Sequence, residues 1–250
     1  MPFNAVHMPP QATEKYLARF PDVKDQTRRI LLAKLSALDD AVGQILGKIR
    51  EHKLEENTLI VFISDNGGPT ASNGSRNTPL SGFKGEVKEG GIREPFMMQW
   101  KGKLPAGKIY DKPVISLDIF PTALAAAGSD APKGVKFDGV NLLPFLTGQS
   151  DDAPHDKLFW RFGPQWAIRD GNYKLRRAED ESTAKLFDLS TDIAEKTDLT
   201  KDHPEIVKRL QGEFDEWNAQ LEKPRWRDSR NASTRIRGRR AAAATQPDDE

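Results

Sequence analysis

The sequence predicts an α/β fold followed by a small α+β subdomain, and three patterns carry this prediction. A helical pattern over residues 25–52 precedes a continuous apolar run at residues 58–64, an order typical of layered α/β sheets. From about residue 134, short alternating runs replace that order. A last amphipathic pattern at residues 204–221 closes the ordered part. We therefore expect a partial mixed sheet flanked by helices, then an antiparallel sheet with one helix.

The first helix and strand are predicted by their different apolar periods. Steps of three and four residues mark one buried helix face, made of Leu31, Leu35, Leu38, Val42, Ile45, Leu46 and Ile49. The run at 58–64, TLIVFIS, is rich in β-branched residues without alternation, which favours a parallel strand covered on both faces. The apolar residues 96–100 predict a return to this sheet. Residues 116–127 predict a helix with Gly128 at its C′ position.

The second part of the chain has the pattern of a strand meander. Its short runs read LFWRF, QWAIR, NYKLRR and KLFDL, and Asp170-Gly171 between two of them predicts a hairpin turn. The helix at 204–221 gathers one apolar side: Ile206, Val207, Leu210, Phe214, Trp217 and Leu221. We expect an α/β part over residues 1–130, a subdomain over 131–222, and a disordered tail over 223–250.

The composition excludes several classes of protein. A length of 250 residues can bury one good core or two modest ones, and 37% hydrophobic residues argue against general disorder. The net charge of +1 gives no field for nucleic acid or a membrane surface, and no apolar run reaches the roughly 18 residues that span a bilayer. Residues 1–11 show no signal-peptide pattern. The absence of cysteine excludes disulfides, thiolate metal sites and a cysteine-derived nucleophile within this chain.

A carboxylate and an amide end the predicted strand at Asp65-Asn66-Gly67-Gly68. In open α/β sheets, ligands bind outside the carboxyl ends of the strands. Asp65 and Asn66 offer the hard oxygen ligands that Ca²⁺ or Mg²⁺ accepts, and the two glycines let the backbone turn sharply. The alternative is a simple turn, since all of these residue types favour turns.

A loop of about 25 residues follows this turn and contains Lys84 in the pattern K-G-x-x-x-E-G-G-x-R-x-P, a length that favours a functional loop. Together with VFISDNGG, this loop resembles the sulfatase family of the alkaline-phosphatase-like superfamily, which includes arylsulfatases and N-acetylgalactosamine-6-sulfatases. Further pieces match in order over residues 3–221: a His-x-Pro segment, ALDDAVGQIL, SLDIFPTALAAAG, DGVNLLPFLTG and KLFDLSTDIAEKTDL.

The resemblance implies a mechanism and a role for four residues. In sulfatases a formylglycine, made from Cys or Ser in a C/S-x-P-S-R motif, attacks a sulfate ester beside a divalent cation, usually Ca²⁺ and alternatively Mg²⁺. By match of motif, Asp65 and Asn66 would bind the metal, and Lys84 would contact the sulfate. His7 would contact the sulfate or the leaving oxygen. The other histidines, His52, His155 and His203, match nothing in the pattern, and we expect them at the surface.

This chain departs from the family pattern in its missing half. The paired aspartates of the metal site and the formylglycine motif do not occur in it. Asp39-Asp40 do not replace the aspartates, because both lie within the predicted helix, where neighbours point about 100° apart. We therefore expect the carboxyl-terminal half of a sulfatase that is inactive by itself. The expected partner is a sulfate ester, including sulfated carbohydrate.

Two other functions remain open. A non-catalytic module could bind sulfated polysaccharide through Lys84 and the basic stretch 223–240, which holds eight Lys or Arg against one Asp. A phosphoester or phosphonate hydrolase of the same superfamily is the other. The family resemblance suggests a secreted, periplasmic or lysosomal location, and the sequence leaves the compartment and oligomeric state undetermined.

Overall fold

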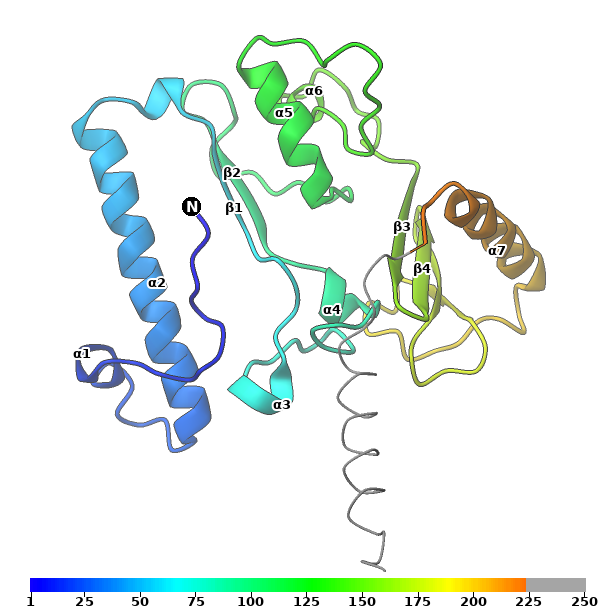
Figure 1. The fold of residues 1–250 in the computed structure, drawn as a ribbon, viewed down its shortest axis with the longest axis horizontal. Coiled ribbons are helices and arrows are strands. Elements are labelled where there is room, and N and C mark those ends of the chain that lie inside the picture. Colours follow the sequence, from blue (N-terminus) through cyan, green and yellow to red (C-terminus); the bar gives the residue numbers. More distant parts are fainter. Residues whose placement is uncertain (224–250) are drawn as a thin grey trace, which may run out of the picture.

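A computed structural model describes residues 1–223 and shows two sheets with their helices (Figure 1). The elements are α1 (Glu14–Leu17), α2 (Gln26–Glu51), η1 (Glu55–Asn57), β1 (Ile60–Ile63), α3 (Thr70–Asn73), α4 (Glu89–Ile92), β2 (Phe96–Gln99), η2 (Ser116–Asp118), α5 (Ile119–Ala126), α6 (Leu143–Leu146), β3 (Lys157–Phe162), β4 (Gln165–Asp170), β5 (Tyr173–Arg177), β6 (Lys185–Asp188) and α7 (Pro204–Ala219). Beyond Lys223, the predicted tail lies outside the described residues. None of the helices described in residues 1–223 combines the length and the hydropathy of a membrane span.

The predicted first helix is confirmed as α2. The side chain of Asp25 caps it by accepting a hydrogen bond from the backbone N–H of Arg28 at 3.1 Å. Its predicted buried face is only partly confirmed. Leu31 is buried, but Leu35 is 42% exposed, because α2 packs against the short elements α1 and α3 rather than against a broad sheet.

The predicted first strand is confirmed as β1, but its expected parallel pairing is wrong. β1 pairs antiparallel with β2, with Ile60 opposite Gln99 and Ile63 opposite Phe96. An apolar run predicts that a strand is buried, but not whether the strand pairs parallel or antiparallel with its neighbour. Here β2 runs back alongside β1 in the opposite direction. The residues of β1 are half-buried, and Met97 on β2 is 55% exposed, so full cover on both faces is also not found in the described part of the chain.

The predicted helix at 116–127 is confirmed as η2 followed by α5, and Gly128 has the positive φ of +65° expected at C′. Buried Asp118 anchors its start by accepting backbone hydrogen bonds from Ile115 at 2.8 Å and Val140 at 2.9 Å. His155 Nε2 lies 2.8 Å from the same carboxylate, and its side chain is 8% exposed. The expectation of a surface His155 is therefore wrong, because a distant buried carboxylate holds it.

The predicted meander is confirmed as an antiparallel sheet in the order β3-β4-β5-β6. The hairpin turn between β4 and β5 is Gly171-Asn172, one residue later than expected, because Asp170 still pairs with Tyr173. Gly171 takes the positive φ, +56°, that such turns require. One face of the sheet packs on α7 through a core of Trp166, Ile168, Leu175, Leu186, Leu210 and Phe214.

The other face of this sheet is polar and yet buried. Gln165 on β4 and Lys174 on β5 are both 0% exposed, and Arg176 is 3% exposed. Side chains alternate across a strand, so these residues point away from α7. They point toward α4 and the loop before it, which lie between the two sheets in Figure 1.

Candidate active site

The turn Asp65-Asn66-Gly67-Gly68 follows β1, and at Gly67 it packs against α4 without space for a side chain. The N–H of Gly67 donates to the carbonyl of Gly91 at 3.1 Å. A Cβ on Gly67 would lie 1.8 Å from the carbonyl oxygen of Gly90. Gly67 thus lets the backbone of the turn approach that of α4, whereas a Cβ on Gly68 would meet the side chain of Ser75. The glycines of α4 instead let it approach the carbonyl oxygens of residues 81–86.

The lysine loop, residues 81–91, is bound to the same turn. The N–H of Lys84 donates to the carbonyl of Gly68 at 3.4 Å. Asn77 reinforces the junction: its amide oxygen accepts from the N–H of Gly68 at 3.1 Å, and its Nδ2 lies 3.0 Å from the carbonyl oxygens of both Gly68 and Gly82. Asn77 could not be predicted as a site residue from the sequence, because one Asn in a polar loop carries no distinctive pattern.

The structure therefore places three of the predicted site residues on connected backbone segments. Asp65 is exposed, whereas Asn66 and Lys84 are half-buried. Asn66 Nδ2 donates to the carbonyl of Gly67 at 3.1 Å, which leaves its Oδ1 without a hydrogen-bond donor in the described residues. Across residues 1–223, neither the Asp65 carboxylate nor the Lys84 ammonium has a hydrogen-bond or ion-pair partner. Both charges are thus available to a ligand.

Glu94 is an acidic neighbour of Asp65 that no motif in the sequence indicated. Burial raises the pKa of the Glu94 carboxyl to about 7, the Ser64 hydroxyl opposes this shift, and the negative charge of Asp65 adds to it. Its Oε1 atom is buried without a hydrogen-bond partner in the described chain. A third oxygen group therefore adjoins the predicted metal pair.

His7 stands apart from this group. It is exposed, and its Nδ1 lies 3.0 Å from the carbonyl of Met8. The ammonium of Lys34 on α2 contacts the carbonyl of His7. Over residues 1–223, no hydrogen bond or ion pair joins His7 to Asp65, Asn66 or Lys84, so its predicted role stays a prediction.

The donors at the turn fit part of a Ca²⁺ or Mg²⁺ shell. Asp65 and Asn66 supply hard oxygens, as such cations prefer, but Ca²⁺ takes about six to eight of them. The described residues hold no cluster of three or more His, Cys, Asp or Glu side chains that could bind a metal. Asp39 is exposed, and Asp40 pairs with Arg19 at 2.8 Å, in agreement with a solvated helix face.

A network of buried charged side chains connects the lysine loop to strand β5. Lys174 Nζ lies 2.7 Å from Glu89 Oε1 and 3.1 Å from Glu195 Oε1. Arg176 pairs with Glu195 at 2.8 Å and with Glu181 at 2.6 Å. Burial opposes ionisation of Glu195, but Lys174 and Arg176 outweigh it and lower the pKa of this carboxyl.

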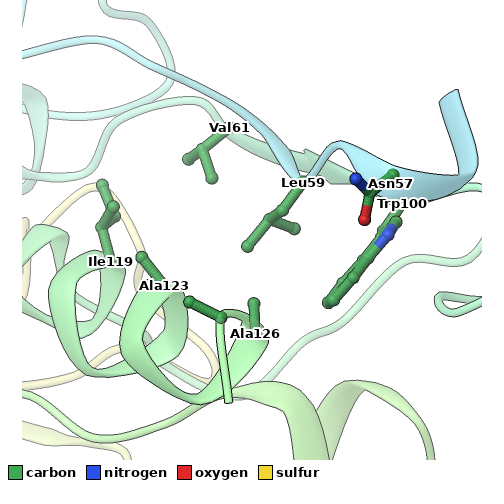
Figure 2. Close-up of a pocket in the computed structure, with 8 residues that line it drawn as sticks. Asn57, Leu59, Val61, Trp100, Ile119, Ala123 and Ala126 are labelled. Atoms are coloured by element: carbon green, nitrogen blue, oxygen red, sulfur yellow. The ribbon is translucent and has the colours of Figure 1, made fainter. Parts of the chain in front are cut away.

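An apolar groove lies at the other end of β1 (Figure 2). Its volume is about 430 Å³, and it runs between β1, Trp100 and α5. Leu59 and Val61 face Ile119, Ala123 and Ala126 across it in Figure 2. Its lining side chains are apolar apart from Asn57 and the indole N–H of Trp100, which donates to the carbonyl of Glu56. The groove adjoins the start of β1, whereas Asp65 follows the end of that strand, so it is separate from the candidate site.

Solved structures with this arrangement define the class of fold. The crystal structure of Ps i-CgsB superposes with a TM-score of 0.85 at 31% identity, covering 94% of this chain and 53% of that one. A second structure of Ps i-CgsB, in complex with k-i-k-neocarrahexaose, gives the same TM-score over 93% of this chain and 52% of that chain. The chain thus has part of the alkaline-phosphatase-like α/β fold.

The chain belongs to the sulfatase family. The Sulfatase family profile matches residues 1–129, and the profile for the carboxyl-terminal part of N-sulphoglucosamine sulphohydrolase matches residues 84–220. The uncharacterized sulfatase YdeN of Escherichia coli is 31% identical over 84% of this chain and 44% of its own length. N-acetylgalactosamine-6-sulfatase of Canis lupus familiaris is 36% identical over 55% of this chain and 27% of its own length. This chain thus spans less than half the length of these relatives.

Proposed function

We propose that this chain supplies the carboxyl-terminal half of a site that hydrolyses sulfate esters. Asp65 and Asn66 bind a divalent cation, for which Ca²⁺ is the first candidate and Mg²⁺ the second. Lys84 contacts the sulfate group. The observation that carries the proposal is the pair of backbone hydrogen bonds, Gly67 to Gly91 and Lys84 to Gly68, that joins the turn to the lysine loop.

The chemistry of these residues suits a sulfate ester. A cation held by Asp65 and Asn66 would supply polarisation of the sulfate oxygens. The ammonium of Lys84 donates hydrogen bonds to those oxygens and stabilises the charge that grows on them as the ester bond breaks. An imidazole such as His7 could protonate the leaving oxygen.

In this proposal, the nucleophile that attacks the sulfate ester is not a residue of this chain. The family's nucleophile derives from Cys or Ser in C/S-x-P-S-R, and the 250 residues contain no such motif. The residues present here bind and orient the ester, and stabilise charge. The chain by itself therefore binds sulfate esters without turning them over.

A carbohydrate sulfate is the proposed class of substrate. One relative is named N-acetylgalactosamine-6-sulfatase, and the similar Ps i-CgsB was solved in complex with k-i-k-neocarrahexaose. These names support the class and not a particular sugar.

Binding of 4-nitrophenyl sulfate to the full 250-residue chain, measured calorimetrically with and without CaCl₂, tests the proposal. Lys84→Ala should weaken binding about tenfold or more, as expected for loss of a charged hydrogen bond. Asp65→Ala should remove the dependence on calcium. In a complete active protein that carries this half, Lys84→Ala should lower turnover by about 10²-fold.

Matched variants remove equal charges elsewhere. Lys101→Ala removes an exposed lysine that pairs with Glu55, and Asp39→Ala removes an exposed carboxylate from α2. Both should bind the probe as the unmodified chain does. Equal losses in Lys84→Ala and Lys101→Ala would reduce the effect to net charge and contradict the assigned site.

A further inference from the structure

Glu195 lies in the loop between β6 and α7, far along the chain from the lysine loop, yet it contacts both ends of that loop. Its Oε2 accepts a hydrogen bond from the Ser81 hydroxyl at 2.7 Å and another from the Glu89 N–H at 2.7 Å. Its backbone takes a positive φ of +53°, which is uncommon outside glycine. The carboxylate is thus a clamp across the loop that carries Lys84.

The second oxygen of the carboxylate faces the sheet. Oε1 of Glu195 lies 2.8 Å from Arg176 Nε and 3.1 Å from Lys174 Nζ, both on β5. Its side chain is 0% exposed. One carboxylate therefore joins the sheet on one side to the lysine loop on the other.

The middle of the loop is also held from the sheet. Gln165 Nε2 donates to the carbonyl of Gly85 at 2.9 Å, and its Oε1 accepts from the N–H of Val87 at 3.4 Å. These two hydrogen bonds hold the loop backbone at Gly85 and Val87, close to Lys84. The Lys84 ammonium itself has no hydrogen-bond or ion-pair partner within residues 1–223. These hydrogen bonds fix the position of the Lys84 backbone and do not occupy its ammonium group.

We propose that Glu195 is a positioning residue that sets the place of Lys84 at the sulfate site. The proposal rests on the proposed function, because it assumes that Lys84 contacts the sulfate. The carboxyl-terminal subdomain then does more than add stability: it orders a loop of the α/β part through one carboxylate.

Glu181 provides a matched control for the charge of Glu195. It pairs with Arg176 at 2.6 Å and with Lys185 at 3.2 Å, and it accepts from the N–H of Ala178. It has no hydrogen bond or ion pair to residues 81–91 in the described chain. Glu181→Gln therefore disturbs the same network without touching the lysine loop.

The experiment uses the full chain, CaCl₂ and 4-nitrophenyl sulfate, with amide hydrogen exchange as a second measurement. In Glu195→Gln, the amides of Glu89 and Gly90 should exchange at least about tenfold faster while those of Leu210 and Phe214 in α7 keep their rates. The same variant should bind the probe about tenfold more weakly, as expected for the loss of hydrogen bonds to a charged group. Glu181→Gln should stay within about twofold of the unmodified chain in both measurements.

A double-mutant cycle separates positioning from general destabilisation. If Glu195 acts through Lys84, Glu195→Gln should change probe affinity little once Lys84→Ala is present. Ser81→Ala removes a single hydrogen bond to Glu195 and serves if Glu195→Gln does not fold. It should produce the same changes at a smaller size.

The two proposals fail in different ways. Unchanged affinity in Lys84→Ala would overturn the proposed function, and the sulfate role of Glu195 with it. If Lys84→Ala loses affinity while Glu195→Gln and Glu181→Gln behave alike, the positioning role alone is overturned. Additive losses in the double-mutant cycle would also overturn it.

Discussion

The Nζ atom of Lys174 on β5 lies 2.7 Å from Oε1 of Glu89 on α4, and both side chains are buried. The two residues are 85 positions apart in the sequence. Their ion pair joins the carboxyl-terminal sheet to the short helix at the end of the lysine loop. A buried ion pair adds little net stability when complete, but loss of one partner leaves a charge without compensation.

We expect Lys174→Met to destabilise the chain by about 3–5 kcal/mol, because Glu89 and Glu195 would lose a buried partner. Urea unfolding followed by circular dichroism measures the change. Lys157→Met is the control, since Lys157 pairs with Glu213 at a side chain that is 34% exposed, and it should cost about 1 kcal/mol or less. The double variant Lys174→Met/Glu89→Gln should regain part of the loss. Equal costs at Lys174 and Lys157 would contradict a buried network.

The elements with strong periodicity could be predicted from the sequence. The helices α2 and α7 and the meander from β3 to β6 have long or repeated apolar patterns. These patterns are enough to predict whether each element is a helix or a strand. The DNGG turn and the lysine loop could be recognised as motifs, and the structure adds that backbone hydrogen bonds join them. The pairing direction of β1 could not be predicted, because it depends on the partner strand and not on the strand's own residues.

The charge network could not be predicted from local patterns. Lys174 and Arg176 alternate with apolar residues on β5, a pattern that normally marks a solvent-facing side. Here the lysine loop covers that side, so the charges are buried among carboxylates from distant segments. His155 shows the same limit: its burial depends on Asp118, which lies 37 positions earlier. Such partners become evident only when the chain is folded.

We expect Gly67→Ala to destabilise the chain by about 1–3 kcal/mol or more, because its Cβ would meet the backbone of Gly90 and neither backbone can move freely. Thermal unfolding measures the effect. Gly43→Ala is the matched control within α2, where a new Cβ meets nothing within 4 Å. This control should stabilise the chain by about 0.5–1 kcal/mol through helix propensity. A neutral Gly67→Ala would mean that the turn does not touch α4 as described.

We expect Asp118→Asn to cost about 1.5–3 kcal/mol, since its carboxylate accepts from two backbone N–H groups and lies beside His155. An amide keeps one acceptor and turns an NH₂ group toward a donor. Asp138→Asn, at an exposed position, should change the unfolding free energy by less than about 0.5 kcal/mol. The urea concentrations at the unfolding midpoints of the two variants measure this difference. Similar midpoints would mean that the contacts of the Asp118 carboxylate do not stabilise the fold.

The lowered pKa of Glu195 predicts a pH dependence of stability with a definite sign. Burial opposes its ionisation, but Lys174 and Arg176 prevail, so the folded-state pKa lies below the unfolded value of about 4.3. A group of this kind stabilises the fold above its unfolded pKa, and the contribution is lost as the pH falls through the folded pKa. The unmodified chain should therefore exceed Glu195→Gln in unfolding free energy by a constant amount above about pH 5, and this difference should shrink below about pH 4. Urea unfolding of both proteins at steps between pH 7 and pH 3 measures it, with Glu14→Gln at an exposed position as the control that should run parallel to the unmodified chain. A difference that stays constant or grows on acidification would mean that Glu195 is not held ionised by the two cations of β5.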